Sequence, residues 1–237
     1  MNLPSRAGLL LLVLLAGCKA APLAPAGFVD STQLTSQQDL PFHRAWIDPA
    51  VDWQRYRRIQ IADVNIDHLS RMDWVQKTGR AEKVKEDAGK LAVYAKQTLE
   101  RAFREDPARR FEVVDQPDGE TIIFEMALVE VIPSKVALNT LGYAPFVGSA
   151  ARLLRGWKYR SMVAFEARLK DGASGETIAQ FADREAEKAA FLNVKDVTWY
   201  GHAESILAEW ARQFVQVTSR KPGQTIRDSK PFTLKPW

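Results

Sequence analysis

The sequence predicts an α+β fold with two layers, in which two amphipathic helices pack on a mostly antiparallel sheet of about five strands. Three observations support this prediction. Several segments alternate apolar and polar residues, two longer segments repeat apolar residues at helical spacing, and the turn sequence at residues 171–175 joins two of the alternating segments. Since such helices and strands each have an apolar face, they can bury these faces against one another.

Alternation and turn residues place the strands of this sheet. A first strand is expected over residues 58–66 and a short one over residues 111–114. Residues 121–132 are apolar on both sides, which is typical of a central strand, and Pro133 ends the pattern. Two further strands should form a hairpin, with a strand, a turn and a returning strand at residues 159–170, 171–175 and 177–187.

Two amphipathic helices should cover the sheet. Residues 83–104 and about 196–218 repeat apolar residues at helical spacing and carry charged residues on the other side. Pro107 lies just past the end of the first helix. We expect four large side chains of these helices to pack on one face of the sheet: Leu99, Phe103, Trp210 and Phe214.

The first eighteen residues have the features of an export signal that ends in a lipidation site. Arg6 precedes an uncharged apolar run over residues 7–15, and Leu15-Ala16-Gly17-Cys18 follows. A helix that spans a bilayer needs about 20 apolar residues, so this shorter run predicts a cleaved signal peptide over residues 1–17. Cys18 is the only cysteine of the chain, and the four residues that end at it resemble the bacterial lipobox. We therefore expect the mature chain to begin at an acylated Cys18.

The residues after Cys18 predict where the mature protein is held. Two or three acyl chains on one cysteine would make the anchor effectively permanent. Lys19 stands where many Gram-negative lipoproteins of the inner membrane have aspartate, so resemblance to that rule favours the periplasmic face of the outer membrane. Residues 18–45 include a Pro/Ala-rich stretch and should form an extended tether. A single α+β domain over residues 46–218 and a basic, loosely ordered tail over residues 219–237 complete the predicted organisation.

The composition limits the classes of function. The chain has 237 residues, of which 46% are hydrophobic and 26% charged, and this suits one globular domain with irregular ends. Its formal net charge of +4 is small and spread along the chain, so we expect no nucleic-acid partner. If Cys18 is acylated, no thiol remains for a disulfide, a cysteine nucleophile or a thiolate metal site.

The residues that could carry catalysis do not lie in recognisable motifs. No serine lies in a nucleophile-elbow sequence, and the three histidines belong to no catalytic pattern: His43, His68 and His202. Mixed Asp and His ligands can hold a divalent metal, but a polar loop collects them easily, as it does here with Asp63, Asp67, His68 and Asp73. The sequence has no glycine-rich phosphate loop. We predict no catalytic residue, no cofactor and no metal ligand.

Charged residues of the predicted hairpin could meet across its two strands. A cross-strand ion pair is the simplest explanation for Glu166, Asp183 and Arg184. The alternative is an acid–base site of two carboxylates, which would require both acids to share a cleft.

Two apolar stretches leave alternatives open. The aromatic residues within 46–56 either pin this segment onto the domain or form a platform for a sugar or peptide. The connector, residues 138–157, combines apolar residues with Arg152 and Arg155. It either folds over an edge of the sheet or contacts lipid headgroups or a partner protein.

Several short features occur in one order along the mature chain. They are the lipobox at Cys18, Gly27-Phe28, the Pro49, Asp52 and Tyr56 set, Val113-Val114-Asp115, Pro133-Ser134-Lys135, Leu138-Asn139-Thr140, the hairpin at 174–176 and the Asp183-Arg184 pair. In these features the chain resembles a bacterial lipoprotein family of unknown function, the domain of unknown function 3313. The resemblance implies an exported lipoprotein of unassigned activity and supplies no catalytic residue.

Together, these observations favour a membrane-anchored lipoprotein of the cell envelope that acts as a non-enzymatic interaction or structural module. Its expected partners are membrane lipid, through the acylated Cys18, and an envelope protein. The alternative is an envelope hydrolase or a small-ligand-binding lipoprotein whose site has no recognisable motif.

Overall fold

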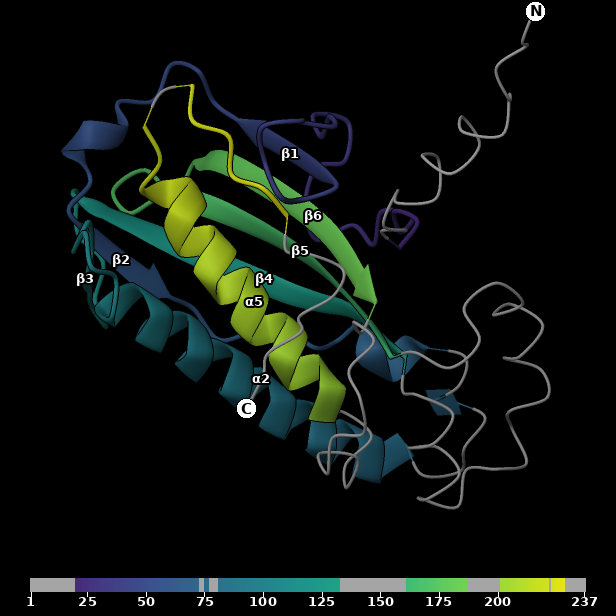
Figure 1. The fold of residues 1–237 in the computed structure, drawn as a ribbon. Helices are drawn as coiled ribbons and strands as arrows, with labels where there is room; N and C mark the ends of the chain where they lie inside the picture. The colour runs from purple at the N-terminus through teal and green to yellow at the C-terminus, as the bar shows by residue number, and fades with distance from the viewer. Residues whose placement is uncertain are drawn as a thin grey trace, which may run out of the picture.

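The computed structural model describes residues 20–72, 75–76, 81–132, 161–186, 201–221 and 223–228 (Figure 1). These residues form a six-stranded sheet in the order β1-β6-β5-β4-β2-β3. The strands are β1 (Arg44–Ile47), β2 (Arg58–Ile61), β3 (Glu112–Val113), β4 (Thr121–Ile132), β5 (Met162–Asp171) and β6 (Thr177–Ala186). The helices are α2 (Ala81–Arg104) and α5 (Gly201–Thr218), with two short 3-10 helices, η2 (Trp53–Arg55) and η3 (Leu69–Arg71).

The α+β class and both amphipathic helices are confirmed, but the predicted sheet is wrong in two respects. The sheet has six strands rather than about five, and it is mixed rather than mostly antiparallel, because β2 pairs in parallel with both β3 and β4. The α2 helix connects β2 to β3, and a helical crossover returns the chain in its original direction. The additional strand β1 has only four residues and lies just before Pro49, so alternation does not reveal it.

The main core lies between the helices and one face of the sheet (Figure 1). The four side chains predicted to meet there are each at most 2% exposed: Leu99, Phe103, Trp210 and Phe214. The Phe214 ring lies 4.8 Å from the ring of Phe124 and 5.3 Å from that of Phe165. Burying one such side chain contributes about 1.5–3 kcal/mol. The burial of all four side chains confirms the predicted apolar faces of both helices.

The opposite face of the sheet is called the outer face below, and residues 20–35, called the N-terminal arm, pack on it. The chain then passes to the helix face, where Leu40 and Phe42 join the main core. Leu23, Ala26 and Phe28 of the arm pack against a small cluster on the outer face, formed by Ala127, Val129 and Ala164. The Thr35 backbone also bridges to Ala45 of the edge strand β1. The described part of the predicted tether therefore lies against the domain.

A β-bulge in β4 lies beside the apolar cluster under the arm. Leu128 pairs with Phe165 and Glu130 pairs with Ala164, so Val129 is the extra residue. The alternation of side chains changes phase at this point. Glu130 therefore lies on the outer face beside Val129, where it pairs with Arg184, and Val131 returns to the main core.

Several predicted segments lie wholly or partly outside the described residues. The signal peptide over residues 1–17, Cys18 and the connector over residues 138–157 are among them. The start of the predicted tail is described, and Ile226 is buried there, with its N–H donating to the carbonyl of Asp39 at 2.9 Å. Within the described part of the chain, no helix has both the length and the apolar character needed to cross a membrane.

Candidate functional site

The Glu166 carboxylate is the centre of the contact between the sheet and the N-terminal arm. Its side chain lies on the outer face of β5 and is 3% exposed. One oxygen accepts a hydrogen bond from the Ala26 N–H at 2.6 Å, and the other accepts from Phe28 at 2.8 Å and Val29 at 3.2 Å. An ionised carboxylate has only acceptors, so three backbone donors are suitable partners for it in a buried site.

Side chains beside Glu166 extend this contact along the arm. The Arg168 guanidinium donates to the Phe28 carbonyl at 3.2 Å and lies 4.7 Å from the centre of the Phe28 ring. The same guanidinium donates to Glu125 at 2.5 Å. On the neighbouring strand, the side-chain oxygen Oε1 of Gln180 accepts a hydrogen bond from the Asp30 backbone N–H at 2.7 Å. The arm is thus held largely through its backbone, by polar side chains of β5 and β6.

A second buried carboxylate, Asp183, joins the edge of the sheet to α5. It is 4% exposed, and its Oδ2 accepts from Trp210 Nε1 at 2.9 Å. Its Oδ1 accepts from the His43 backbone N–H at 3.0 Å and lies 2.5 Å from His43 Nδ1. Asp183 therefore connects the residue just before β1, the strand β6 and the helix α5.

The imidazole of His43 links Asp183 to Ala20. His43 Nε2 lies 2.6 Å from the carbonyl oxygen of Ala20. The Arg184 backbone N–H also donates to His43 Nδ1, at 3.3 Å. Both ring nitrogens are engaged by the protein itself.

The structure separates the charged residues that we expected to meet across the hairpin. Glu166 pairs in register with Ala182, so the next residue, Asp183, points to the opposite face of the sheet. Arg184 forms its ion pair with Glu130 of β4, at 2.6 Å, on the outer face. The predicted cross-strand ion pair is therefore wrong, and the two carboxylates cannot form one acid–base site because the sheet lies between them.

The polar loop after β2 does not gather a metal site in its described part. Asp63 forms an ion pair with Lys96 of α2 at 2.7 Å. The hydrogen bond from Lys96 holds the pKa of Asp63 below its usual value, and the same bond raises the pKa of Lys96. Among the described residues, no three His, Cys, Asp or Glu side chains lie close enough to share a metal ion. Asp73 and the His202 side chain lie outside the described residues.

The aromatic residues before β2 pin their segment onto the domain, as one of the two sequence interpretations predicts. Tyr56 is 1% exposed and donates to Asp171 at 2.7 Å, and Trp53 packs partly buried against the main core. Arg55 forms an ion pair with the same Asp171 carboxylate. Sequence analysis missed this contact because the two partners lie 115 residues apart. A single aspartate at the start of a hairpin turn gives no signal of a distant partner.

These contacts define a class of protein: an α+β domain that uses buried carboxylates on its sheet to hold its own N-terminal arm and its last helix. Within that class, the chain belongs to the family described as "Protein of unknown function (DUF3313)", which matches residues 24–214. The family resemblance found from the sequence is therefore confirmed, while lipidation of Cys18 stays a prediction. No curated protein matches the chain.

Two solved structures are similar to this chain at low sequence identity. A PelC dodecamer from Paraburkholderia phytofirmans is 8% identical, with 75% of this chain and 97% of that chain covered and a TM-score of 0.38. A DUF330 protein from Xanthomonas campestris is 9% identical, with 73% of this chain and 90% of that chain covered and a TM-score of 0.40.

Proposed function

We propose that this protein is a cell-envelope lipoprotein, anchored through an acylated Cys18 at the periplasmic face of the outer membrane, whose domain serves as a non-enzymatic interaction or structural module. The observation that carries the proposal is the position of the only cysteine. It follows a short apolar run and the small residues Ala16 and Gly17, and it comes just before Ala20, where the chain meets the domain.

The engagement of the buried charged groups supports a role without catalysis. Glu166 accepts three N–H groups of the arm, and His43 uses both ring nitrogens within the chain. The pocket between the arm and the sheet is lined by Leu23, Pro25 and Leu34, among others, and is small. Groups that are already bonded in this way are poor candidates for binding a substrate, and they are well suited to fixing the arm.

Mass spectrometry of the mature protein from a Gram-negative host tests the anchor. The wild-type chain should begin at Cys18, carry acyl chains on it and remain with the membrane fraction. Cys18→Ser should remove the lipid and leave a precursor that is not correctly processed. An unmodified N-terminus beyond Cys18 in the wild-type protein would show that the proposal is wrong.

Two further measurements test the choice of the outer membrane and the non-enzymatic role of the domain. Lys19→Asp should move the lipoprotein from the outer-membrane to the inner-membrane fraction of a density gradient, whereas Lys19→Ser should leave it in place. Turnover of peptidoglycan fragments or other envelope substrates by the purified mature protein would overturn the non-enzymatic role and favour the hydrolase alternative.

A further inference from the structure

We propose that the domain sits directly on the bilayer, with one end of its sheet against the lipid headgroups and the other end away from the membrane. The membrane-facing end is where β4 and β6 end and β5 begins (Figure 1). This inference rests on the proposed acylation of Cys18 and adds the surface that meets the lipid. It differs from the expectation that residues 18–45 form an extended tether, which would hold the domain away from the bilayer.

Ala20 is fixed to this end of the sheet. Its side chain is 2% exposed and packs against Met162 and Ala186, with Ile132 beside them. These three residues are the first of β5 and the last of β6 and β4. The Ala20 carbonyl lies 2.6 Å from His43 Nε2. Ala20 therefore lies on the end of the sheet.

A second hydrogen bond holds the residue that follows. Arg184 donates from its guanidinium to the carbonyl of Ala21 at 3.3 Å. Arg184 is itself held by Glu130 through two hydrogen bonds, at 2.6 and 3.1 Å. Packing and hydrogen bonds from β4, β5, β6 and His43 thus converge on Ala20 and Ala21.

The covalent chain leaves no room for a spacer between this end and the lipid. Only Lys19 lies between Cys18 and Ala20. Consecutive Cα atoms are about 3.8 Å apart, so Cα of Ala20 can lie at most about 7.6 Å from Cα of Cys18. The headgroup region of one leaflet is roughly 5–8 Å thick. Acyl chains inserted in the hydrocarbon core would therefore hold Ala20, and the strand ends packed on it, at the headgroup layer.

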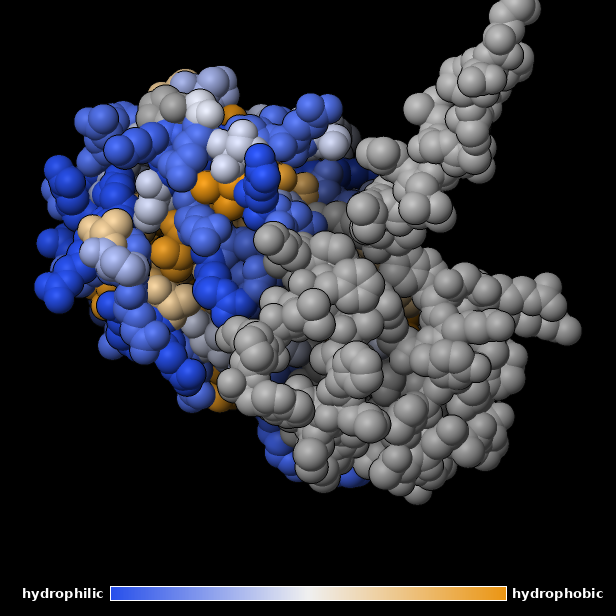
Figure 2. Space-filling view, in the orientation of Figure 1, coloured by the Kyte–Doolittle hydropathy of each residue, from blue (hydrophilic) through white to orange (hydrophobic). Residues whose placement is uncertain are grey.

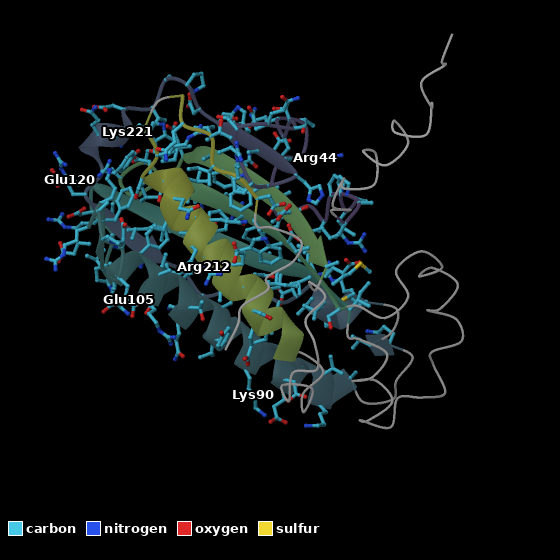
Figure 3. The ribbon with its side chains drawn as sticks, viewed as in Figure 1. Arg44, Lys90, Glu105, Glu120, Arg212 and Lys221 are labelled. Carbon is cyan, nitrogen blue, oxygen red and sulfur yellow. The ribbon has the colours of Figure 1, made fainter. Side chains whose placement is uncertain are left out.

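The far end of the sheet, where β4 begins, is the part of this strand farthest from Ala20. Glu112, Asp118 and Glu120 lie there and form ion pairs with Arg58. Glu120, labelled in Figure 3, immediately precedes β4. The 12 residues of β4 separate the two ends by roughly 40 Å, at about 3.3 Å per residue.

Two single-cysteine labels can measure this orientation, because the acylated Cys18 leaves no other thiol in the chain. Arg71→Cys places an exposed label near the membrane-facing end, since Met72 Sδ lies 3.5 Å from the Val131 backbone N. Glu120→Cys places a label at the far end. The full-length acylated protein would carry a donor dye and be bound to vesicles of phosphatidylethanolamine and phosphatidylglycerol with an acceptor dye on a few headgroups.

We expect energy transfer to the lipid acceptor to be several-fold more efficient from the Arg71→Cys label than from the Glu120→Cys label. Equal transfer from both labels would mean that the domain lies flat or is held away from the bilayer, and would overturn the inference. This result differs from a failure of the proposed function. In that case, mass spectrometry would find no lipid on Cys18 and both labelled proteins would stay free of the vesicles.

A spacer variant tests whether the short chain causes the position. Ten Gly/Ser residues inserted after Lys19 have a root-mean-square length of roughly 17 Å. The insertion should lower transfer from the Arg71→Cys label and reduce the difference between the two labels. The same ten residues inserted after Gly223, in the described tail, should leave both signals unchanged. Unchanged transfer with the first insertion would contradict the inference.

Discussion

Glu166 and Asp183 lie on neighbouring antiparallel strands, one register position apart, yet their carboxylates point to opposite faces of the sheet. Glu166 bonds the N-terminal arm on the outer face, and Asp183 bonds Trp210 on the helix face. Each face of this sheet thus has a buried acceptor that fixes the layer above it. The first two predictions test these two roles.

Replacing Glu166 should release the N-terminal arm. Glu166→Gln keeps the shape of the side chain but turns an acceptor oxygen into an NH₂ group, which must then face a backbone N–H. An unsatisfied buried polar group costs about 1–3 kcal/mol, and we expect a loss of unfolding free energy in this range by urea denaturation. Amide hydrogen exchange should rise at Ala26, Phe28 and Val29, whose N–H groups lose their acceptor.

Glu125→Gln is the matched control for the Glu166 variant. Glu125 lies on the same face of the sheet, but its side chain is 23% exposed and it pairs with Arg168 and Lys170. Partly exposed ion pairs contribute little, typically below about 1 kcal/mol. If both variants changed arm exchange equally, the specific role of Glu166 would be refuted.

Trp210 should combine a packing role with a hydrogen-bonding role. Trp210→Ala removes a side chain that is 1% exposed and should cost about 3–5 kcal/mol of unfolding free energy. Trp210→Phe retains much of the volume but loses the N–H that donates to Asp183, so we expect a smaller loss of about 1–3 kcal/mol. A change below about 0.5 kcal/mol for Trp210→Ala would contradict the assigned helix face.

Gly172 should tolerate no side chain. A Cβ atom at this position would lie 2.4 Å from the carbonyl oxygen of Asp118 and 2.7 Å from that of Thr121. Both obstacles are backbone atoms, so Gly172→Ala must move the hairpin turn or the start of β4. Such overpacking typically costs about 1–3 kcal/mol, measurable as a lower melting temperature.

Gly119→Ala provides the comparison for the Gly172 variant. A Cβ atom at Gly119 would meet nothing within 4 Å, although this residue lies next to Asp118. Its melting temperature should stay close to that of the wild-type protein. Equal destabilisation by the two substitutions would mean that the turn is sensitive to any loss of glycine and not to the close approach at Gly172.

Asp118 should make stability depend on acid pH. The hydrogen bond from the Thr121 hydroxyl, followed by that from the Glu120 N–H, holds the pKa of Asp118 below its usual value. A carboxyl whose folded pKa is depressed stabilises the fold fully above its unfolded pKa, and this contribution is lost as pH falls through the folded value. The wild-type protein should therefore be more stable than Asp118→Asn near pH 6, and the difference should shrink below about pH 4.

Denaturation curves for both proteins across this pH range would check whether the difference in unfolding free energy shrinks as the pH falls. The comparison cancels the other carboxyl groups, which titrate in both proteins. A difference that grew as the pH fell would contradict the assignment of the hydrogen bonds at Asp118.

The elements with a strong local pattern were predictable from the sequence. Residues 121–132 form β4 with the predicted bounds, and α2 over Ala81–Arg104 starts two residues before the predicted helix. Their apolar periodicity records which side is buried, whatever partner buries it. The hairpin of β5 and β6 was predictable for the same reason, since its turn residues lie between two alternating segments.

The sequence alone also determined the predicted lipidation site, because a signal that a processing enzyme reads must be encoded in contiguous residues that end at Cys18. The place of the arm was decided only by the tertiary structure. Its backbone N–H groups bond a glutamate 140 residues away, and β1 exists because β6 offers it an edge. Such contacts depend on backbone groups that every residue has, so no residue type in the arm marks them. The faces of Glu166 and Asp183 follow from strand register, which the sequence leaves open until the sheet has formed.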